Sequence, residues 1–273
     1  MSIRSIMSCY TGGGGGPAAL HMAILMARKY DARITGAVWQ APNPLRRRAG
    51  AFFTREIDRI LDQAETEFAA DRRAAFTAAV DQAGLADRAD FIVLNTKRYG
   101  IAEAARAHDV IVMGSAAPDE AGDDFTVRPD VVALRSGRPV VIVPHDFDAP
   151  AIVETAVVAW DGKRASARAL SDAMHILGTK DRVTLLAVGD GIASDHGQDV
   201  LRLLALHGID ADISVTPVGP GGIGRTILDA CDQLGAGLLI MGAYEHSKFS
   251  EDLLGGVTRE ILENARLPVL MSH

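Results

Sequence analysis

The sequence predicts an α/β protein made of two tandem copies of one fold, each a doubly wound parallel sheet of five strands. Each half alternates apolar strands with helical segments, as expected of parallel sheets covered by helices on both faces. Four segments of the first half also recur in the second half in the same order: residues 6–20 as 156–170, 32–38 as 182–188, 109–114 as 237–242 and 138–143 as 267–272. Repeats this far apart indicate two whole domains and not an array of short units.

The composition is that of a globular protein of two domains. The chain has 273 residues, of which 48% are hydrophobic and 23% charged. A net charge of -7 argues against nucleic acid or an anionic membrane as the main partner, because both bind concentrated basic surfaces. No apolar run reaches the roughly 20 residues of a membrane span, and Met1–Arg4 do not resemble the start of a secretory signal. We therefore expect a soluble, cytoplasmic protein.

The cysteines and histidines give no indication of a metal site. Cys9 and Cys231 have no metal-ligand spacing, so we expect both to fill the core in a reducing compartment. The eight histidines lack zinc-like spacing. Arg46–Arg48 form the only basic cluster and lie in a proline-containing segment, which favours a solvated loop over a binding patch.

The second half is expected to contain five strands. Continuous apolar residues, without alternation of apolar and polar positions, indicate strands that are buried on both faces. They are residues 156–160, 182–188, 213–218, 238–241 and 269–271. Intervening segments have the 3.6-residue periodicity of helices, as in Ile227, Leu228, Cys231 and Leu234.

The first half is expected to follow the same order, with strands at residues 3–9, 33–39, 89–94, 110–113 and 140–143. It carries roughly twenty extra residues between its second and fourth strands, because the offset between the halves falls from 150 to 128 or 129. These residues lengthen a helix that begins near Thr54 and continues towards Val80, with an apolar stripe that is core or interface. Prolines bracket a connector at residues 144–150. The predicted domains are residues 1–147 and 148–273.

Ligands of doubly wound sheets bind beyond the carboxyl ends of the strands, where loops meet helix N-termini. Four segments of the second half are expected to meet at this edge: Asp161–Gly162, Val188–Asp190, Gly219–Gly224 and Gly242–Thr258. The last is the most specific. The glycine-rich segment 219–224 is explained most simply as the loop before a helix.

The opening Val-Val-Ala-Trp-Asp161-Gly and the long segment Gly242–Thr258, followed by a helix and Pro268-Val-Leu, resemble the universal stress protein family. The duplication resembles a tandem member covering essentially the whole chain. The resemblance implies a five-stranded parallel sheet per domain. In members that bind ATP, it also implies a Gly-x2-Gly-x9-Gly-Ser/Thr loop around the phosphates and an aspartate near the adenine. Asp161, Gly242 and Gly255 match these positions.

Two positions of the loop depart from the family pattern. Glu245 stands at the second glycine, and Gly256 stands at the hydroxyl residue. A carboxylate about 4 Å from a phosphate costs roughly 1 kcal/mol in water and about 4 kcal/mol at an effective dielectric of 20. Glu245 could instead turn to solvent or meet a bound metal ion such as Mg²⁺, and Thr258 could supply the hydroxyl. A tight turn into a helix is the alternative explanation of Gly255–Gly256.

The first half departs more completely from the pattern. Thr11 replaces the aspartate, and the segment after Gly114 contains four carboxylates and no glycine pair. We therefore expect this half to have lost the nucleotide site. The run Gly12–Gly16 lacks the Lys-Ser/Thr of a P-loop. It is either a strand-to-helix turn, with Pro17 favouring the start of the helix, or a backbone nest for a small anion.

The leading hypothesis is a tandem universal stress protein that binds a small molecule, such as ATP or another adenine nucleotide with Mg²⁺, in its second half. The ligand would stabilise the loop Glu245–Leu254 and so alter a surface that partners recognise. No catalytic residues or protein metal ligands are predicted. The predicted binding residues are Asp161, Gly162, Val188, Gly242, Gly255, Gly256, Val257 and Thr258.

Two other classes of function remain open at this point. The first is a nucleotide-free scaffold, in which the halves pack as a pseudo-dimer through residues 139–143 and 268–271 and the pocket is vestigial or holds another ligand. The second is an enzyme, either a slow ATPase or an adenylating enzyme, although no general base or phosphate-binding lysine is evident. The sequence also leaves a homodimer open.

Overall fold

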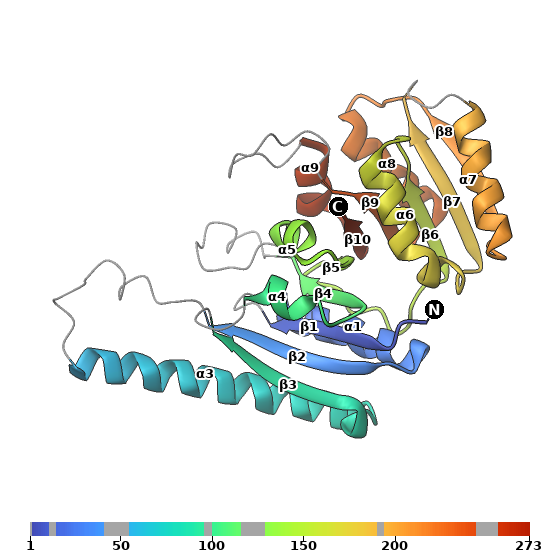
Figure 1. Ribbon diagram of the computed structural model, residues 1–273. Helices are drawn as coiled ribbons and strands as arrows, with labels where there is room; N and C mark the ends of the chain where they lie inside the picture. Colours follow the sequence, from blue (N-terminus) through green and yellow to red (C-terminus); the bar gives the residue numbers. More distant parts are fainter. Residues whose placement is uncertain are drawn as a thin grey trace.

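A computed structural model describes residues 2–10, 15–40, 55–95, 100–115, 129–189, 194–243 and 256–273. These residues form one ten-stranded sheet with the strand order β3-β2-β1-β4-β5-β10-β9-β6-β7-β8. The first five strands in sequence make up one half of the sheet and the last five make up the other (Figure 1). The predicted α/β fold with parallel strands in each half is confirmed.

The first half places its strands in the order β3-β2-β1-β4-β5, all parallel. Its elements are β1 (Ser5–Tyr10), α1 (Gly16–Tyr30), β2 (Arg33–Gln40), α3 (Arg55–Gln82), the short 3-10 helix η2 (Ala86–Arg88), β3 (Ala89–Asn95), α4 (Ile101–Ala105), β4 (Val110–Gly114), α5 (Pro129–Ser136) and β5 (Val140–Val143).

The second half repeats this order as β8-β7-β6-β9-β10, again all parallel. Its elements are β6 (Thr155–Ala159), α6 (Arg164–Leu177), β7 (Arg182–Val188), α7 (Ser194–Leu206), β8 (Ala211–Thr216), α8 (Gly222–Leu234), β9 (Leu238–Gly242), α9 (Gly256–Asn264) and β10 (Val269–Ser272). The two halves therefore share one topology, as the sequence repeat predicted.

Strands β5 and β10 join the halves by antiparallel pairing, in which Val269 lies opposite Ile142 and Leu270 opposite Val141. The pairing of these two edge strands, predicted for the scaffold alternative, is confirmed. The sequence suggested two separate sheets, whereas the structure has one continuous sheet. Each of the two strands would otherwise present unpaired backbone groups along an apolar edge, so their pairing satisfies both.

Helices cover both faces of the sheet, and each face has one apolar cluster. Helices α1, α3, α6 and α7 contribute to one cluster, through residues such as Met26, Phe76, Leu177 and Leu204. Helices α4, α5, α8 and α9 contribute to the other. Within the described segments, no helix is both long and apolar enough to span a membrane.

Helix α3 contains the extra residues of the first half, because it has 28 residues where its counterpart α7 has 13. Its C-terminal part packs in the core through Phe76 and Val80. Its N-terminal part extends past the sheet (Figure 1), and there Ile57 is 43% exposed and Ile60 is 61% exposed. The predicted apolar stripe is therefore core only along the C-terminal part of the helix.

A cluster of Lys29, Glu154 and Lys180 connects the two halves away from the paired strands. The Lys29 ammonium at the end of α1 lies 2.5 Å from the Glu154 carboxylate, and Lys180 Nζ lies 3.2 Å from it. Lys180 also donates to the Val153 carbonyl at 2.7 Å, and its side chain is only 1% exposed. Burial lowers the pKa of Lys180, partly offset by the charge of Glu154.

The two lysines determine the ionisation of Glu154. Burial by itself would raise the pKa of this carboxyl, but hydrogen bonds and charges from Lys29 and Lys180 together lower it below its ordinary value of 4.5. A carboxyl with a lowered pKa stabilises the folded state above its unfolded pKa, and this contribution is lost as the pH falls through the folded pKa. The cluster should therefore hold the halves together near neutral pH and weaken in acid.

We predict that Glu154→Gln lowers the free energy of unfolding by about 1 to 3 kcal/mol at pH 7, because it leaves the buried Lys180 ammonium without its counter-ion. Urea unfolding measures this difference, which should shrink below pH 4. The control is Glu263→Gln, which removes the partner of Arg259 in an exposed ion pair and should cost under about 0.5 kcal/mol. Equal losses in the two variants would contradict the role given to the cluster.

We also predict that Val141→Ala destabilises the whole protein by about 2 kcal/mol, because Val141 is 1% exposed in the central pair of strands. The matched control is Val215→Ala in the edge strand β8, where Val215 is 64% exposed and the change should stay within about 0.5 kcal/mol. Thermal and urea unfolding measure both. If Val141→Ala were as mild as Val215→Ala, the central pairing would not carry this stability.

Candidate functional site

The structure brings the predicted binding residues of the second half to the carboxyl edge of its sheet. Asp161 and Gly162 follow β6, Val188 ends the neighbouring strand β7, and Gly242 ends β9 on the other side of β6. Gly256, Val257 and Thr258 form the first turn of α9, the helix that follows β9. Gly255 and Glu245 lie outside the described residues. The predicted gathering of segments at this edge is therefore present for the described members.

Asp161 is bonded to the start of α6. Its Oδ1 atom accepts hydrogen bonds from the Lys163 backbone N–H at 3.1 Å and from the Ser166 hydroxyl at 2.6 Å. The Lys163 ammonium lies 4.0 Å from Oδ2. Helices leave their first N–H groups without intrahelical partners, so a carboxylate here stabilises α6. Asp161 thus has a structural role through Oδ1, whereas Oδ2 accepts no hydrogen bond from the part of the chain that the structure describes.

Sequence reasoning missed Ser166 and Lys163. Ser166 is buried, and its hydroxyl also lies 2.9 Å from the Lys163 carbonyl, so it fixes the turn that carries Asp161. The spacing Asp161-x-Lys163-x-x-Ser166 could have indicated this arrangement, because a carboxylate before a helix bonds the N–H two residues on. The structure therefore adds both residues to the site.

Two glycines shape the turns at this edge. Gly162 has φ +76° and Gly189 has φ +87°, which are left-handed conformations that side chains with a Cβ rarely adopt. Each follows a strand end, after Asp161 and Val188 respectively. These glycines are therefore required by the backbone path, whether or not a ligand is present.

Gly242 allows the start of α6 to pack directly on the end of β9. A Cβ at position 242 would lie 2.6 Å from the Ser166 nitrogen and 2.7 Å from the Ala165 Cβ. The first half has the same contact, because a Cβ at Gly114 would lie 2.7 Å from the Gly15 Cα. A glycine shared by both halves, including the half without the nucleotide pattern, is explained by this packing alone.

The start of α9 is more open than the start of α6. A Cβ at Gly256 would meet no atom of the described residues within 4 Å. Thr258 is buried in the first turn, and Val257 packs against the apolar cluster on this face of the sheet. The first turn of α9 is therefore a place where backbone N–H groups could meet an anion, whereas the Thr258 side chain is largely enclosed.

The glycine-rich segment 219–224 forms the loop before α8 at residues 219–221 and the first residues of the helix at 222–224, which agrees with the predicted entry into a helix. The Thr226 hydroxyl accepts a hydrogen bond from the Gly219 N–H and donates one to the Gly222 carbonyl. The Glu260 carboxylate of α9 packs against Gly224, where a Cβ would lie 2.9 Å from the Glu260 Cδ. A carboxylate at this helix start disfavours a second anion there.

At the corresponding edge of the first half, the structure describes only part of the equivalent segments. Gly15 precedes α1 and Pro17 lies in its first turn, in agreement with the strand-to-helix turn expected there. Thr11 and Gly12–Gly14, and the acidic segment from residue 116 to 128, lie outside the described residues. The predicted loss of a nucleotide site in this half therefore remains a prediction.

The thiols and acidic groups of the described residues do not form a reactive or metal-binding centre. Cys9 and Cys231 are buried and free, and burial raises the pKa of each thiol to about 12. A thiol with so high a pKa is a poor nucleophile, so the prediction that both fill the core is confirmed. Across the ranges that the structure describes, no three His, Cys, Asp or Glu side chains could hold a metal ion.

We predict that Gly242→Ala lowers the free energy of unfolding by about 1 to 3 kcal/mol, because the added Cβ meets backbone that cannot easily move. Gly256→Ala is the matched control in the same segment and should change stability by no more than about 0.5 kcal/mol. Thermal unfolding compares the two variants. An unaffected Gly242→Ala protein would show that α6 does not pack on β9 as described.

Comparisons with known proteins agree with this fold. Residues 153–273 match the model of the universal stress protein family. A universal stress protein from Archaeoglobus fulgidus DSM 4304 superposes with a TM-score of 0.74 at 18% identity, covering 98% of this chain and 95% of that chain. A putative universal stress protein from Pseudomonas aeruginosa UCBPP-PA14 gives a TM-score of 0.56 at 15% identity, covering 99% and 93%.

A universal stress protein solved in complex with cAMP covers 45% of this chain and 98% of its own length, at 23% identity and a TM-score of 0.35. No curated protein matches the chain by sequence. The matched residues 153–273 begin just before β6 and include the whole of the site described above. Residues 153–273 are therefore similar in sequence to the universal stress protein family, the whole chain has the fold of solved universal stress proteins, and the N-terminal half repeats the topology of the C-terminal half.

Proposed function

We propose that the protein binds an adenine nucleotide, such as ATP, at the carboxyl edge of its second half and acts as a binding protein without catalysis. The observation that carries the proposal is the gathering of Asp161, Gly242 and the first turn of α9 around β6 and β9. Residues 1–147 would then be a domain that supports residues 148–273 through the shared sheet.

In the proposed complex, Asp161 lies near the adenine and the segment 242–258 surrounds the phosphates, as the family resemblance implies. The Oδ2 atom of Asp161 is the oxygen that is not bonded to α6, so it is the acceptor offered to an exocyclic amine. The first turn of α9 would supply backbone N–H groups to a phosphate. The Lys163 ammonium, 4.0 Å from Asp161, adds positive charge at the same edge.

Magnesium, if it accompanies the nucleotide, would be held mainly by the phosphates, since Mg²⁺ usually binds through substrate phosphates and few carboxylates. The sequence suggests Glu245 as such a carboxylate. Among the residues that the structure describes, no cluster of three His, Cys, Asp or Glu side chains is placed to hold a metal ion.

A nucleotide-free scaffold is the second candidate function, and three observations favour it. Gly242 has the same packing role as Gly114 in the other half, and Asp161 stabilises α6 without any ligand. The paired strands β5 and β10 join the two halves, as this scaffold requires. In this alternative the edge would be vestigial or would hold another molecule.

Calorimetric titration with ATP and Mg²⁺ distinguishes the two candidates when it includes the variant Glu245→Gly. If the carboxylate weakens a genuine phosphate site, its removal should raise the affinity by between about fivefold and about a thousandfold. Glu120→Gly, in the corresponding segment of the first half, is the control and should change nothing. Absence of heat at millimolar ATP from both the wild-type protein and Glu245→Gly would reject nucleotide binding and leave the scaffold.

A further inference from the structure

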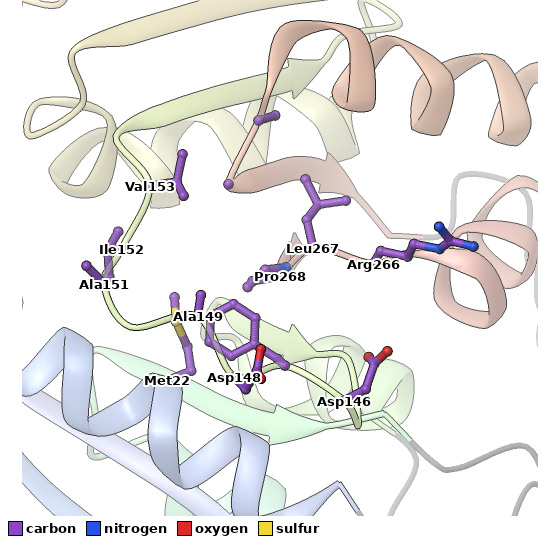
Figure 2. A pocket seen from close by; sticks show the side chains of 13 residues that line it. Met22, Asp146, Asp148, Ala149, Ala151, Ile152, Val153, Arg266, Leu267 and Pro268 are labelled. Carbon is purple, nitrogen blue, oxygen red and sulfur yellow. The ribbon is translucent and has the colours of Figure 1, made fainter.

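The ten-stranded sheet ends in two free edge strands, β3 and β8. Among the described residues, the exposed large apolar side chains lie mostly at these two ends. At one end they belong to α3 and β3, and at the other to α7, β8, the loop after β8 and the start of α8. The remaining one, Val153, lies in the connector at the wall of a cavity of about 270 Å³ at the junction of the two halves (Figure 2). Apolar surface is therefore left open chiefly at the ends of the sheet.

Strand β8 presents a row of unpaired backbone groups along its outer side. The Thr216 carbonyl accepts a hydrogen bond at 2.8 Å from the N–H of Gly189, the residue after β7. Successive residues of a strand direct their backbone groups to opposite sides, so those of Ala211, Ile213 and Val215 point away from β7. No strand of the described residues pairs with them. Such an edge can pair with a strand of another chain.

The side chains of Ala211, Ile213 and Val215 lie on one face of the sheet, because they alternate with Asp212 and Ser214. Ala211 and Ile213 pack against the apolar cluster to which α7 contributes, whereas Val215 is 64% exposed. Leu206, the last residue of α7, is 85% exposed, and only residues 207–210 separate it from the start of β8. Exposed apolar side chains therefore lie near both ends of this open edge.

The opposite edge strand, β3, is less suited to pairing. The guanidinium of Arg73 on α3 lies over the ring of Phe91 at 4.8 Å, and Asp90 bonds Arg33 at 2.8 Å. Charged side chains over an edge strand oppose its pairing with another chain. In β8, by contrast, Asp212 is the only charged residue.

We propose that β8 pairs in antiparallel fashion with β8 of a second copy of this chain, about a two-fold axis at Ile213. Ile213 of each copy then faces the other, and Ala211 lies opposite Val215 of the partner subunit. The residues with outward backbone groups are thus matched with one another, as an antiparallel ladder requires. On their shared face, all the opposed side chains are apolar. On the other face, Asp212 lies opposite Ser214 of the partner subunit, whose hydroxyl can donate to the carboxylate.

Neighbouring registers of the same pairing are disfavoured by named residues. A shift of one residue would set outward backbone groups against inward ones. A shift of two residues in one direction would place the two copies of Asp212 directly opposite each other, and like charges opposite each other destabilise a sheet. A shift of two in the other direction would bring in Pro217, which has no N–H to donate, opposite Ala211. The register centred on Ile213 avoids all three problems.

The helices beside β8 also fit this arrangement. The two-fold axis of such a pair is perpendicular to the sheet, so α7 of both copies lies on the same face (Figure 1). β5 and β10 already join the two halves in this way, with α1 and α6 on one face. Leu206, near the amino end of β8, then approaches the exposed Val215 of the partner subunit. The pairing therefore brings together the two most exposed apolar side chains at this end of the sheet.

The proposed contact is small and independent of nucleotide binding. β8 has six residues, so it is about 20 Å long, and permanent dimers bury more surface than one such edge offers. We therefore expect a reversible dimer that forms as the concentration rises. β6, which precedes Asp161, is separated from β8 by β7.

Sedimentation velocity of the full chain, from micromolar to millimolar concentration, tests the proposal and should show a monomer–dimer equilibrium. Val215→Lys should weaken the association at least about tenfold, because it places a charge in the apolar row. Its unfolding midpoint should be unchanged, since the side chain is exposed. The matched control is Ile60→Lys, at the other end of the sheet, where Ile60 is 61% exposed and the association should not change.

Two further variants test the register. Ser214→Lys should strengthen the association by about fivefold, because each dimer gains two pairs with Asp212 of the partner subunit. Ser214→Asp should weaken it by a similar factor, because like charges then lie opposite each other. Unfolding midpoints check that both variants fold. Equal effects of the two changes would overturn the proposed register.

Hydrogen exchange measured at low and high protein concentration locates the contact. The amides of Ile213 and Val215 should exchange more slowly at concentrations where the dimer forms. A protein that stays monomeric at millimolar concentration would overturn the proposal. Association that is weakened by Ile60→Lys and not by Val215→Lys would also overturn it, as would growth beyond a dimer, which head-to-tail pairing of β8 with β3 would produce.

Discussion

The antiparallel pairing of β5 with β10 is the interaction on which the rest of the structure depends. Each half alone would end in a fully buried, apolar edge strand whose backbone groups have no partner, and such an edge is unstable in water. Pairing the two edges removes both at once and fuses ten strands into one sheet. Because both halves belong to one chain, each edge strand always has its partner. The same pairing fixes how the two halves are arranged.

This fusion explains why the two halves could diverge in their edges without diverging in fold. Gly114 and Gly242 admit the first helix of each half in the same way, so the packing of that helix is preserved in both. Asp161 belongs only to the second half, because Thr11 stands at its position in the first half, and the extra length of α3 belongs only to the first half. The shared sheet does not depend on either feature, so both could change without loss of the fold. The proposed binding function lies at the first of them, the edge that carries Asp161.

Much of this architecture could be predicted from the sequence because its causes are local. Apolar runs such as Val140–Val143 and Leu238–Met241 indicate buried strands by themselves, and the repeat gave their order. Contacts between distant residues were not predictable. The Lys29–Glu154–Lys180 cluster joins residues 125 positions apart, and the bond from Ser166 to Asp161 depends on how a turn folds back. The apolar stripe of α3 was recognised, but periodicity alone does not tell where the sheet beneath a helix ends.

Hydrogen exchange of the intact protein, followed residue by residue, tests the central claim most directly. If one sheet runs through both halves, the amides of residues 140–142 and 269–271 should be among the slowest to exchange and should exchange through global unfolding. Their protection should match that of the central strands β1 and β6. Rapid exchange at both segments, with β1 and β6 still protected, would show two sheets that merely touch and would contradict the account.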